Sequence, residues 1–175
     1  MCKMLFIGTQ NEIQEILLDT VDPDLYLEKI SGEFLPIKPT FKNQNIYFIG
    51  TSWGCSCDFG IQSNKRDPTY IEQTTPIQNL INKYRKLSGT FDEWKKRHQE
   101  KVVNAIEVQA DYLTQTLKLV DIILNETKKG NTVEMFCVWA GDYNTTPEFN
   151  DIIDTTKVDL RENFEIAERE FVTFE

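Results

Sequence analysis

Two short apolar runs constrain the fold of this chain more than any other feature of its sequence. Residues 3–8 and 46–50 are rich in aromatic and β-branched side chains, and both runs lead into the same string, Phe-Ile-Gly-Thr. Runs of this length that stop at a glycine are typical of buried strands. The two strands are separated by a long stretch of sequence, so the chain must build a sheet from distant segments.

Weaker patterns complete the expected sheet. Residues 132–139 place apolar side chains on at least one face, and the last residues, 168–174, are rich in Phe and Val, so both segments are predicted strands. A further strand is predicted over residues 25–30, a short helix over residues 11–18, and a loop at Pro36 and Pro39.

The middle of the chain predicts two helices. Thr75-Pro76-Ile77-Gln78 combines an N-cap threonine, a proline at the first helical position and a capping-box glutamine, and it predicts a helix over residues 76–87. Thr90-Phe91-Asp92-Glu93 is a second capping box, and it opens a helix over residues 91–127. The apolar stripe of this second helix is Phe91, Trp94, His98, Val102, Ile106, Ala110, Leu113, Leu117, Val120 and Leu124.

The second helix is long for the protein that carries it. Unbroken, residues 91–127 would span about 55 Å at 1.5 Å per residue, whereas a compact domain of this chain length is about 40 Å across. The helix therefore overhangs the domain, bends, or packs against another chain. A homodimer through the long helix is one of these alternatives.

These elements predict an α+β fold over a single domain, residues 1–175. Strands occur before and after the helical block, which favours a two-layer arrangement. We expect a mixed or antiparallel sheet of about five strands, with a helical hairpin that includes the long helix on one face.

The charge of the chain limits its partners. The net charge is −9, which disfavours binding to nucleic acid or anionic lipid. Residues 83–101 carry seven basic and three acidic residues, but the aromatic side chains among them lie on the apolar stripes and are needed for the core. Residues 142–175 carry ten acidic and three basic residues. The two regions either face each other or form separate partner surfaces.

The apolar runs are too short for a membrane span, which needs about 20 residues. The N-terminus also lacks the apolar core of a signal peptide. The sequence therefore predicts a cytoplasmic protein that contacts no membrane, with its four cysteines as thiols.

The most unusual segment is the loop from Gly50 to Gly60, directly after a predicted buried strand. Its glycines allow tight turns around Trp53, Cys55, Cys57 and Asp58. Alternate-residue spacing can place both sulfur atoms on one side. If the protein has a binding or redox site, we expect it here, although plain turns of this composition are equally common.

Metal binding and thiol chemistry are alternative roles for this loop. Cys2 and Cys137 lie on predicted strands that could bring them near Cys55 and Cys57, and four thiolates would close a zinc site, but Cys-x-Cys matches the usual Cys-x₂₋₄-Cys spacing poorly. A reactive thiol needs a positive neighbourhood, and the adjacent residue is Asp58. No other cofactor is indicated.

Other catalytic arrangements find no support in the sequence. The single histidine, His98, lies on the apolar stripe of the long helix, where a packing role is more usual than a catalytic one. Asp142 follows a predicted strand, a position where acidic residues usually form turns. Whether the chain is an enzyme is left open.

The opening Met1-Cys2 with Leu5-Phe6-Ile7, and Gly54-Cys55-Ser56-Cys57 after the Tyr47–Thr51 run, resemble small uncharacterised bacterial proteins. Those proteins share a Met-Cys start, a Gly-Cys-x-Cys loop after an early strand, and a closing strand. The resemblance implies a bacterial cytoplasmic origin, and it points to no mechanism. Two functions therefore stay open: a non-enzymatic interaction protein, using the long helix or the acidic C-terminal third, or a small thiol or metal site at Cys55 and Cys57.

Overall fold

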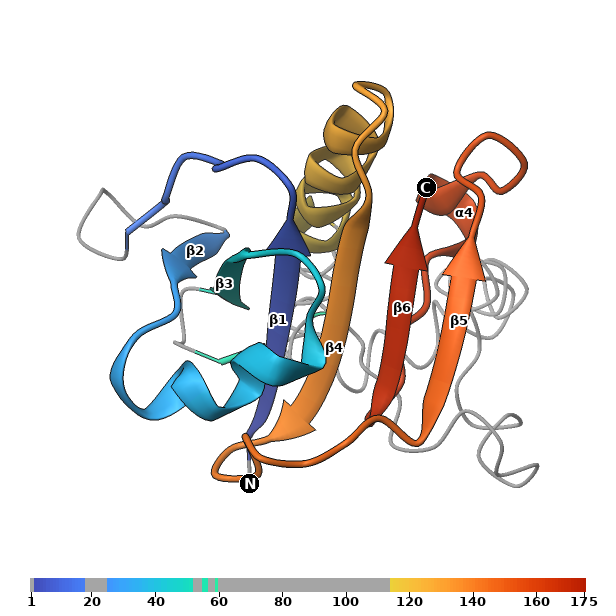
Figure 1. The fold of residues 1–175 in the computed structure, drawn as a ribbon. Helices are drawn as coiled ribbons and strands as arrows, with labels where there is room; N and C mark the ends of the chain where they lie inside the picture. The colour runs from blue at the N-terminus through green and yellow to red at the C-terminus, as the bar shows by residue number, and fades with distance from the viewer. Residues whose placement is uncertain (1, 18–24, 52–54, 57–58, 60–113) are drawn as a thin grey trace, which may run out of the picture.

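The computed structural model describes residues 2–17, 25–51, 55–56, 59 and 114–175. They form a mixed six-stranded sheet in the order β2-β3-β1-β4-β6-β5 (Figure 1). Every neighbouring pair is antiparallel except β5 and β6, which are parallel. The strands are β1 (Lys3–Thr9), β2 (Tyr26–Lys29), β3 (Asn45–Gly50), β4 (Val133–Trp139), β5 (Phe149–Ile153) and β6 (Glu170–Phe174).

The sheet is built around β1, and all seven residues of this strand are buried. It pairs with β3 on one side, with Leu5 opposite Ile49, and with β4 on the other, with Leu5 opposite Cys137. A strand buried on both faces is apolar almost throughout rather than alternating. Of the two predicted sheet types, mixed or antiparallel, the structure has the mixed one, with six strands rather than about five.

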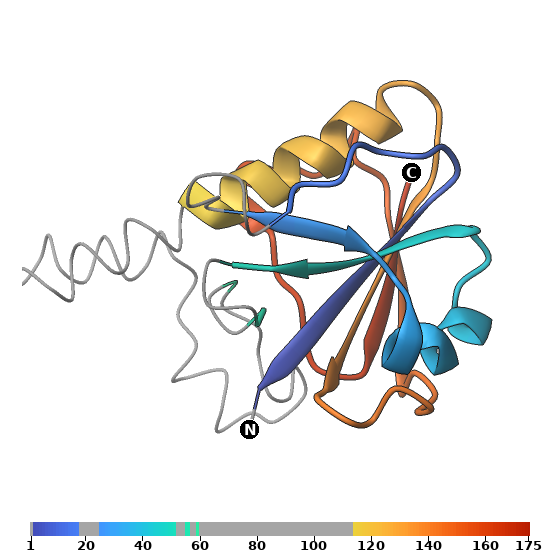
Figure 2. The ribbon, with the colours of Figure 1, turned by 90° about the vertical axis from the view of Figure 1, so that its left-hand side faces the viewer.

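One face of the sheet packs against the helix over residues 114–127 (Figure 2). Leu119, Val120 and Ile123 of this helix are fully buried against the side chains that β1, β3 and β4 direct to this face. The helix ends at the turn of Gly130, which has a left-handed φ of 80°. The sheet side chains of this core include Leu5, Ile7, Tyr47, Ile49, Val133, Met135, Cys137, Val172 and Phe174.

The opposite face has its own core, so the predicted two-layer arrangement is wrong. A 3₁₀-helix, η1 (Gly32–Thr40), lies on this side of the sheet (Figure 2). Phe34 of η1 stacks on Phe48 at 5.3 Å and meets Tyr143 edge-on at 5.1 Å. The physical reason is that β1, β3 and β4 direct large apolar side chains to both faces. This second core contains Met4, Phe6, Ile46, Phe48, Phe136, Val138 and Phe171.

A buried carboxylate joins the end of η1 to the sheet. Glu134 of β4 is almost fully buried, and its Oε2 accepts hydrogen bonds from the backbone N–H groups of Lys42 (3.0 Å) and Asn43 (2.9 Å). The Asn43 side chain in turn donates to the backbone oxygen of Gly8 at 3.2 Å. A Cβ atom at Gly8 would lie only 2.6 Å from the ring of Phe41, so the turn approaches β1 where a glycine is needed.

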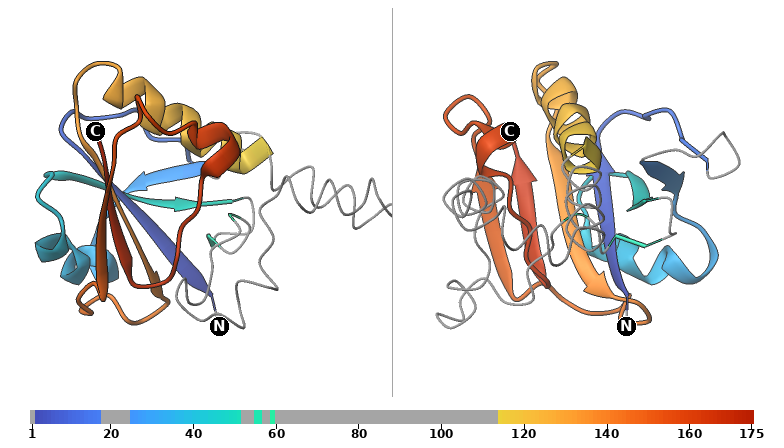
Figure 3. Two further views of the ribbon diagram at one scale, coloured as in Figure 1. Left: turned by 90° about the vertical axis from the view of Figure 1, so that its right-hand side faces the viewer. Right: turned by 180° about the vertical axis from the view of Figure 1, so that it is seen from behind.

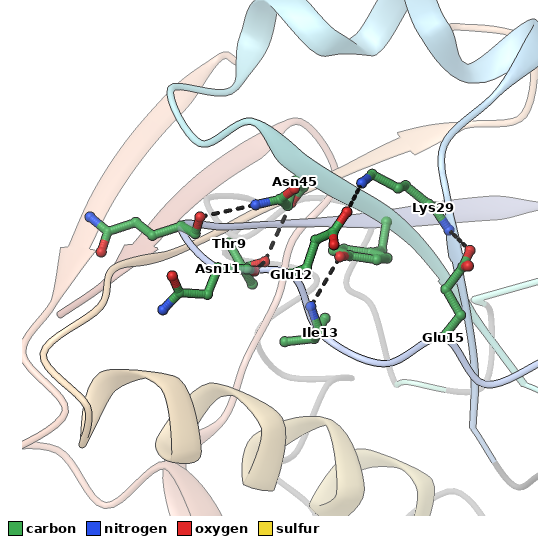
Figure 4. A network of polar contacts seen from close by, with 9 residues as sticks. Thr9, Asn11, Glu12, Ile13, Glu15, Lys29 and Asn45 are labelled. Atoms are coloured by element: carbon green, nitrogen blue, oxygen red, sulfur yellow. Dashed lines mark hydrogen bonds and ion pairs between the residues drawn. The ribbon is translucent and has the colours of Figure 1, made fainter.

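The short helix predicted over residues 11–18 is wrong for residues 11–17, which are extended or bent. Long-range hydrogen bonds hold this segment instead. Ile16 exchanges two backbone hydrogen bonds of 2.9 Å with Leu27, and Ile13 N–H donates to the Tyr47 hydroxyl at 3.0 Å. Around them, Lys29 binds Glu12 through its ammonium and Glu15 through its backbone N–H (Figure 4). These bonds to β2 and β3 outweigh a weak helical preference.

Two further features differ from expectation. The prolines at 36 and 39 lie inside η1 rather than in a loop, because a 3₁₀-helix tolerates their fixed φ and missing N–H. The strand β5 and the helix α4 (Leu160–Asn163), which Asp159 caps by accepting from Arg161 N–H, were not predicted. Both are short and carry charged residues at exposed positions.

Only part of the predicted helical hairpin lies within the described residues. Residues 114–127 are helical and end where predicted, whereas the predicted helix over 76–87 and residues 91–113 lie outside the described part of the chain. The single-domain assignment for residues 1–175 therefore stays a prediction. Within the described segments, no helix is long and apolar enough to cross a membrane.

The buried face of the helix is rotated from the predicted stripe. Leu117 and Leu124 are only half-buried, whereas Leu119 and Ile123 are fully buried. The face with Leu119, Val120 and Ile123 packs on the sheet, and of these three residues only Val120 belongs to the predicted stripe.

The different burial of Leu117 and Leu119 predicts that the two leucines contribute unequally to the free energy of unfolding. Leu119→Ala should lower the free energy of unfolding by about 2–5 kcal/mol, because it opens a cavity in the core. Leu117→Ala, two residues away, should cost only about 1 kcal/mol. Urea unfolding followed by circular dichroism measures both values. Equal losses would contradict the observed packing and restore the predicted stripe.

Candidate functional site

The predicted site, the loop after β3, is held to the sheet by a residue that the sequence analysis did not single out. Ser56 is fully buried between β1 and β3. Its Oγ accepts a hydrogen bond from Leu5 N–H at 2.8 Å and donates one to the Ile49 carbonyl oxygen. Its own N–H donates to the Lys3 oxygen at 3.1 Å. Ser56 therefore links the two central strands where their pairing ends.

Cys55 is placed by this anchor. Its backbone oxygen accepts a hydrogen bond from Thr51 N–H at 2.9 Å, and Thr51 directly follows β3. Its side chain is half-buried and remains a thiol. In the sequence, Cys55-Ser56-Cys57 stands out as a run of small residues. The sequence alone cannot distinguish a serine that is buried and hydrogen-bonded from a serine in a polar turn.

Cys2 and Cys137 differ in their burial. Cys137 is fully buried in the helix-side core, opposite Leu5, whereas Cys2 is exposed just before β1. Side chains alternate between faces along a strand. Leu5 shares the helix-side face with Cys137, so the position of Cys2, three residues before Leu5, belongs to the other face.

Metal binding at the four cysteines stays a prediction. Among the described residues, no three His, Cys, Asp or Glu side chains are grouped to hold a metal ion. Trp53, Cys57 and Asp58 lie outside the described residues, and so does His98. Asp142 belongs to the turn after β4, where its N–H donates to the Trp139 oxygen at 3.0 Å.

The second candidate site is the edge strand β5, which the sequence analysis missed. It is the last strand of the sheet, and among the described segments only β6 pairs with it. Glu175 N–H donates to the Ile153 oxygen at 3.0 Å, so the polar backbone groups of Ile153 point toward β6. These groups alternate in direction along a strand. The backbone groups of Asn150 and Ile152 therefore point away from β6. Figure 3 shows β5 as the outermost strand on this side of the sheet.

The side chain of Ile152 is 71% exposed. Ile153 contacts the helix-side core, so Ile152 points to the opposite face of the sheet. On that face η1 lies toward β1 and β3, and none of the described segments crosses β5 (Figure 1). The edge thus combines an exposed apolar side chain with outward-facing backbone groups.

Two acidic residues lie on β5 or directly after it. Asp151 is exposed on β5 itself, and Asp154 follows the strand. The Asp154 carboxylate pairs with the Lys157 ammonium at 2.6 Å and accepts hydrogen bonds from Thr156. These contacts, the bond to Lys157 first, lower the pKa of Asp154 to about 2. The carboxylate therefore remains charged throughout the physiological pH range.

The hydrogen bonds of Ser56 predict that loss of its hydroxyl group strongly destabilises the fold. Ser56→Ala should lower the free energy of unfolding by about 2–4 kcal/mol, because the buried Leu5 N–H and Ile49 oxygen each lose a partner. Ser31→Ala is the matched control, since the Ser31 hydroxyl makes no capping bond to η1. Chemical unfolding of both variants tests this. If Ser56→Ala is as stable as Ser31→Ala, the anchor is not structural.

Comparisons with protein-family models, with curated proteins and with solved structures gave no match.

Proposed function

We propose that this chain is a cytoplasmic, non-enzymatic interaction protein that binds a protein partner at the outer edge of β5. The observation that carries the proposal is the exposure of Ile152 on an edge strand. Exposed edge strands are templates for pairing with another chain. The acidic C-terminal third, which the sequence analysis considered as a partner surface, contains this strand.

Other exposed apolar side chains support the proposal less well. Among the described residues, Leu17, Leu35 and Val158 are also exposed, but each is less exposed than Ile152 and none lies on a strand. Scattered apolar side chains are normal on a protein surface. Ile152 differs because it stands beside outward-facing backbone groups.

The long helix is a weaker candidate surface over its described part. Leu119, Val120 and Ile123 use the apolar face of residues 114–127 within the chain itself. A partner helix would meet the remaining faces, which are polar or only half-buried. Homodimerisation through residues 91–113 stays a prediction outside the described residues.

A thiol or metal function at Cys55 and Cys57 remains the alternative proposal. It is favoured by the half-buried position of Cys55 at the end of a buried strand, since the sulfur is neither sealed in the core nor fully open. Elemental analysis for zinc, together with thiol titration of Cys55→Ser and Cys57→Ser, distinguishes this alternative from the interaction proposal.

Site-specific cross-linking tests the interaction proposal. A photoreactive phenylalanine analogue at Asn150, in the full chain expressed in its native host, should give a discrete cross-linked product. The same analogue at Val158, which is exposed but off the sheet, should not. Ile152→Lys should abolish the product at position 150, because it replaces the apolar contact with a charge.

Thermal unfolding of each variant is the control for folding. No product at position 150, or the same products at positions 150 and 158, would contradict binding at this edge.

A further inference from the structure

We propose that residues 10–17 form a strap that closes the outer edge of β2 and opens separately from the rest of the sheet. While it is closed, the strap prevents β2 from pairing with β2 of a second copy of this chain. The inference concerns the end of the sheet opposite to β5, and it is independent of the proposed function.

The outer edge of β2 carries backbone groups that need partners. β2 is the last strand on its side of the sheet, and polar backbone groups alternate in direction along a strand. Ile30 N–H donates to the Ile46 oxygen of β3 at 3.0 Å, so the backbone groups of Glu28 also point toward β3. The groups of Leu27 and Lys29 therefore point outward. An unpaired edge of this kind is a template for another strand.

The strap occupies both of these outward positions. Ile16 and Leu27 exchange two backbone hydrogen bonds of 2.9 Å, which is the pattern of an antiparallel strand pair. The Glu15 carboxylate accepts a further hydrogen bond from Lys29 N–H at 2.7 Å (Figure 4). The strap thus takes the place of a neighbouring strand with one backbone pair and one side-chain acceptor.

Few contacts hold the strap closed, and most of its side chains are exposed. Within the described residues its bridge to β2 is a single residue pair, whereas β1 and β4 pair along their whole length. One further bond, from Ile13 N–H to the Tyr47 hydroxyl, ties the strap to β3. The ion pair of Glu12 with Lys29 lies at the surface, where such pairs contribute little. Segments held in this way open at a lower free energy than the whole fold.

A second copy of β2 fits the edge that the strap covers. In a two-fold antiparallel pairing centred on Leu27, the two Leu27 residues would exchange the bonds that each now makes with the strap. Glu28 would then stand opposite Tyr26, and Lys29 opposite Leu25, so no like charges would be directly opposed. Both straps must leave their edges before this pairing can form. The closed strap therefore keeps the two chains apart.

Amide hydrogen exchange of the full chain, followed by NMR, tests whether the strap opens separately. Relative to their intrinsic rates, the amides of Leu27 and Lys29 should exchange at least about tenfold faster than the amide of Ile30, which bonds to β3. Ile30 is the internal control, because fraying of β2 as a whole would expose all three amides together. Equal protection of the three amides would overturn the separate opening.

Two neighbouring strap residues provide a matched pair of variants. Glu15→Ala removes the acceptor of Lys29 N–H, so it should raise the exchange rate of the Lys29 amide several-fold and leave that of Ile30 unchanged. Gln14→Ala, which alters an exposed residue of the same strap, should change neither rate. If Glu15→Ala behaves like Gln14→Ala, Glu15 does not hold the strap closed.

Sedimentation velocity of a strap-release variant tests the role of the strap in keeping chains apart. Ile16→Pro removes the N–H that bonds to the Leu27 oxygen. About 0.5 M sodium chloride screens the repulsion between two chains of net charge −9. Under these conditions the variant should dimerise with a dissociation constant at least about tenfold below that of the unmodified chain.

A second substitution identifies the edge through which the dimer forms. Lys29→Pro, added to Ile16→Pro, removes an outward N–H without removing a bond to β3, so it should restore the monomer. Thermal unfolding checks the folding of each variant. If Ile16→Pro does not fold, Glu15→Ala combined with Ile16→Gly releases the strap in its place. A strap-release variant that stays monomeric, or a dimer that survives Lys29→Pro, would overturn the inference.

Discussion

The burial of β1 on both faces is the constraint on which the rest of the structure depends. All seven of its residues are buried, and it is paired on both edges. A strand in this position requires cover on each side of the sheet. The helix over residues 114–127 supplies one cover, and η1 with the turn around Tyr143 supplies the other. Ser56 and Glu134 then satisfy the polar groups that this packing would leave buried.

The two covers are centred on the middle of the sheet, which explains the character of its far edge. The apolar contacts of η1 are mainly with β1, β3 and β4. The strand β5 lies outside β6 and pairs with it in parallel, and η1 does not cover it (Figure 1). Its outer side chains are accordingly exposed, and its backbone edge is open among the described segments. The proposed function follows from this uneven covering.

The sequence predicted the central strands well because their signal is physical and local. The Phe-Ile-Gly-Thr runs and residues 132–139 are too apolar to lie anywhere but in the interior, and the structure places them in β1, β3 and β4. It did not predict the cover that η1 forms on the second face of the sheet. Both faces of β1 are apolar, a pattern that demands two covers, but the prolines of η1 suggested a loop.

The candidate sites were harder to predict for a different reason. The strand β5, Phe-Asn-Asp-Ile-Ile, lacks the apolar alternation of a half-buried strand, because an edge strand with one paired side needs little burial. Ser56 gave no separate signal, since its importance comes from two backbone groups that lie 51 and 7 residues away in the sequence. Such long-range satisfaction is a property of the folded chain alone.

Amide hydrogen exchange of the isolated protein, measured residue by residue by NMR, distinguishes a fully covered β1 from an open edge at β5. We expect slow exchange throughout β1, because both of its edges and both of its faces are covered. Along β5 we expect alternation, with fast exchange at Asn150 and Ile152 and slow exchange at Asp151 and Ile153. Uniform protection along β5 would contradict the account, because it would show that another part of the chain already pairs with this edge.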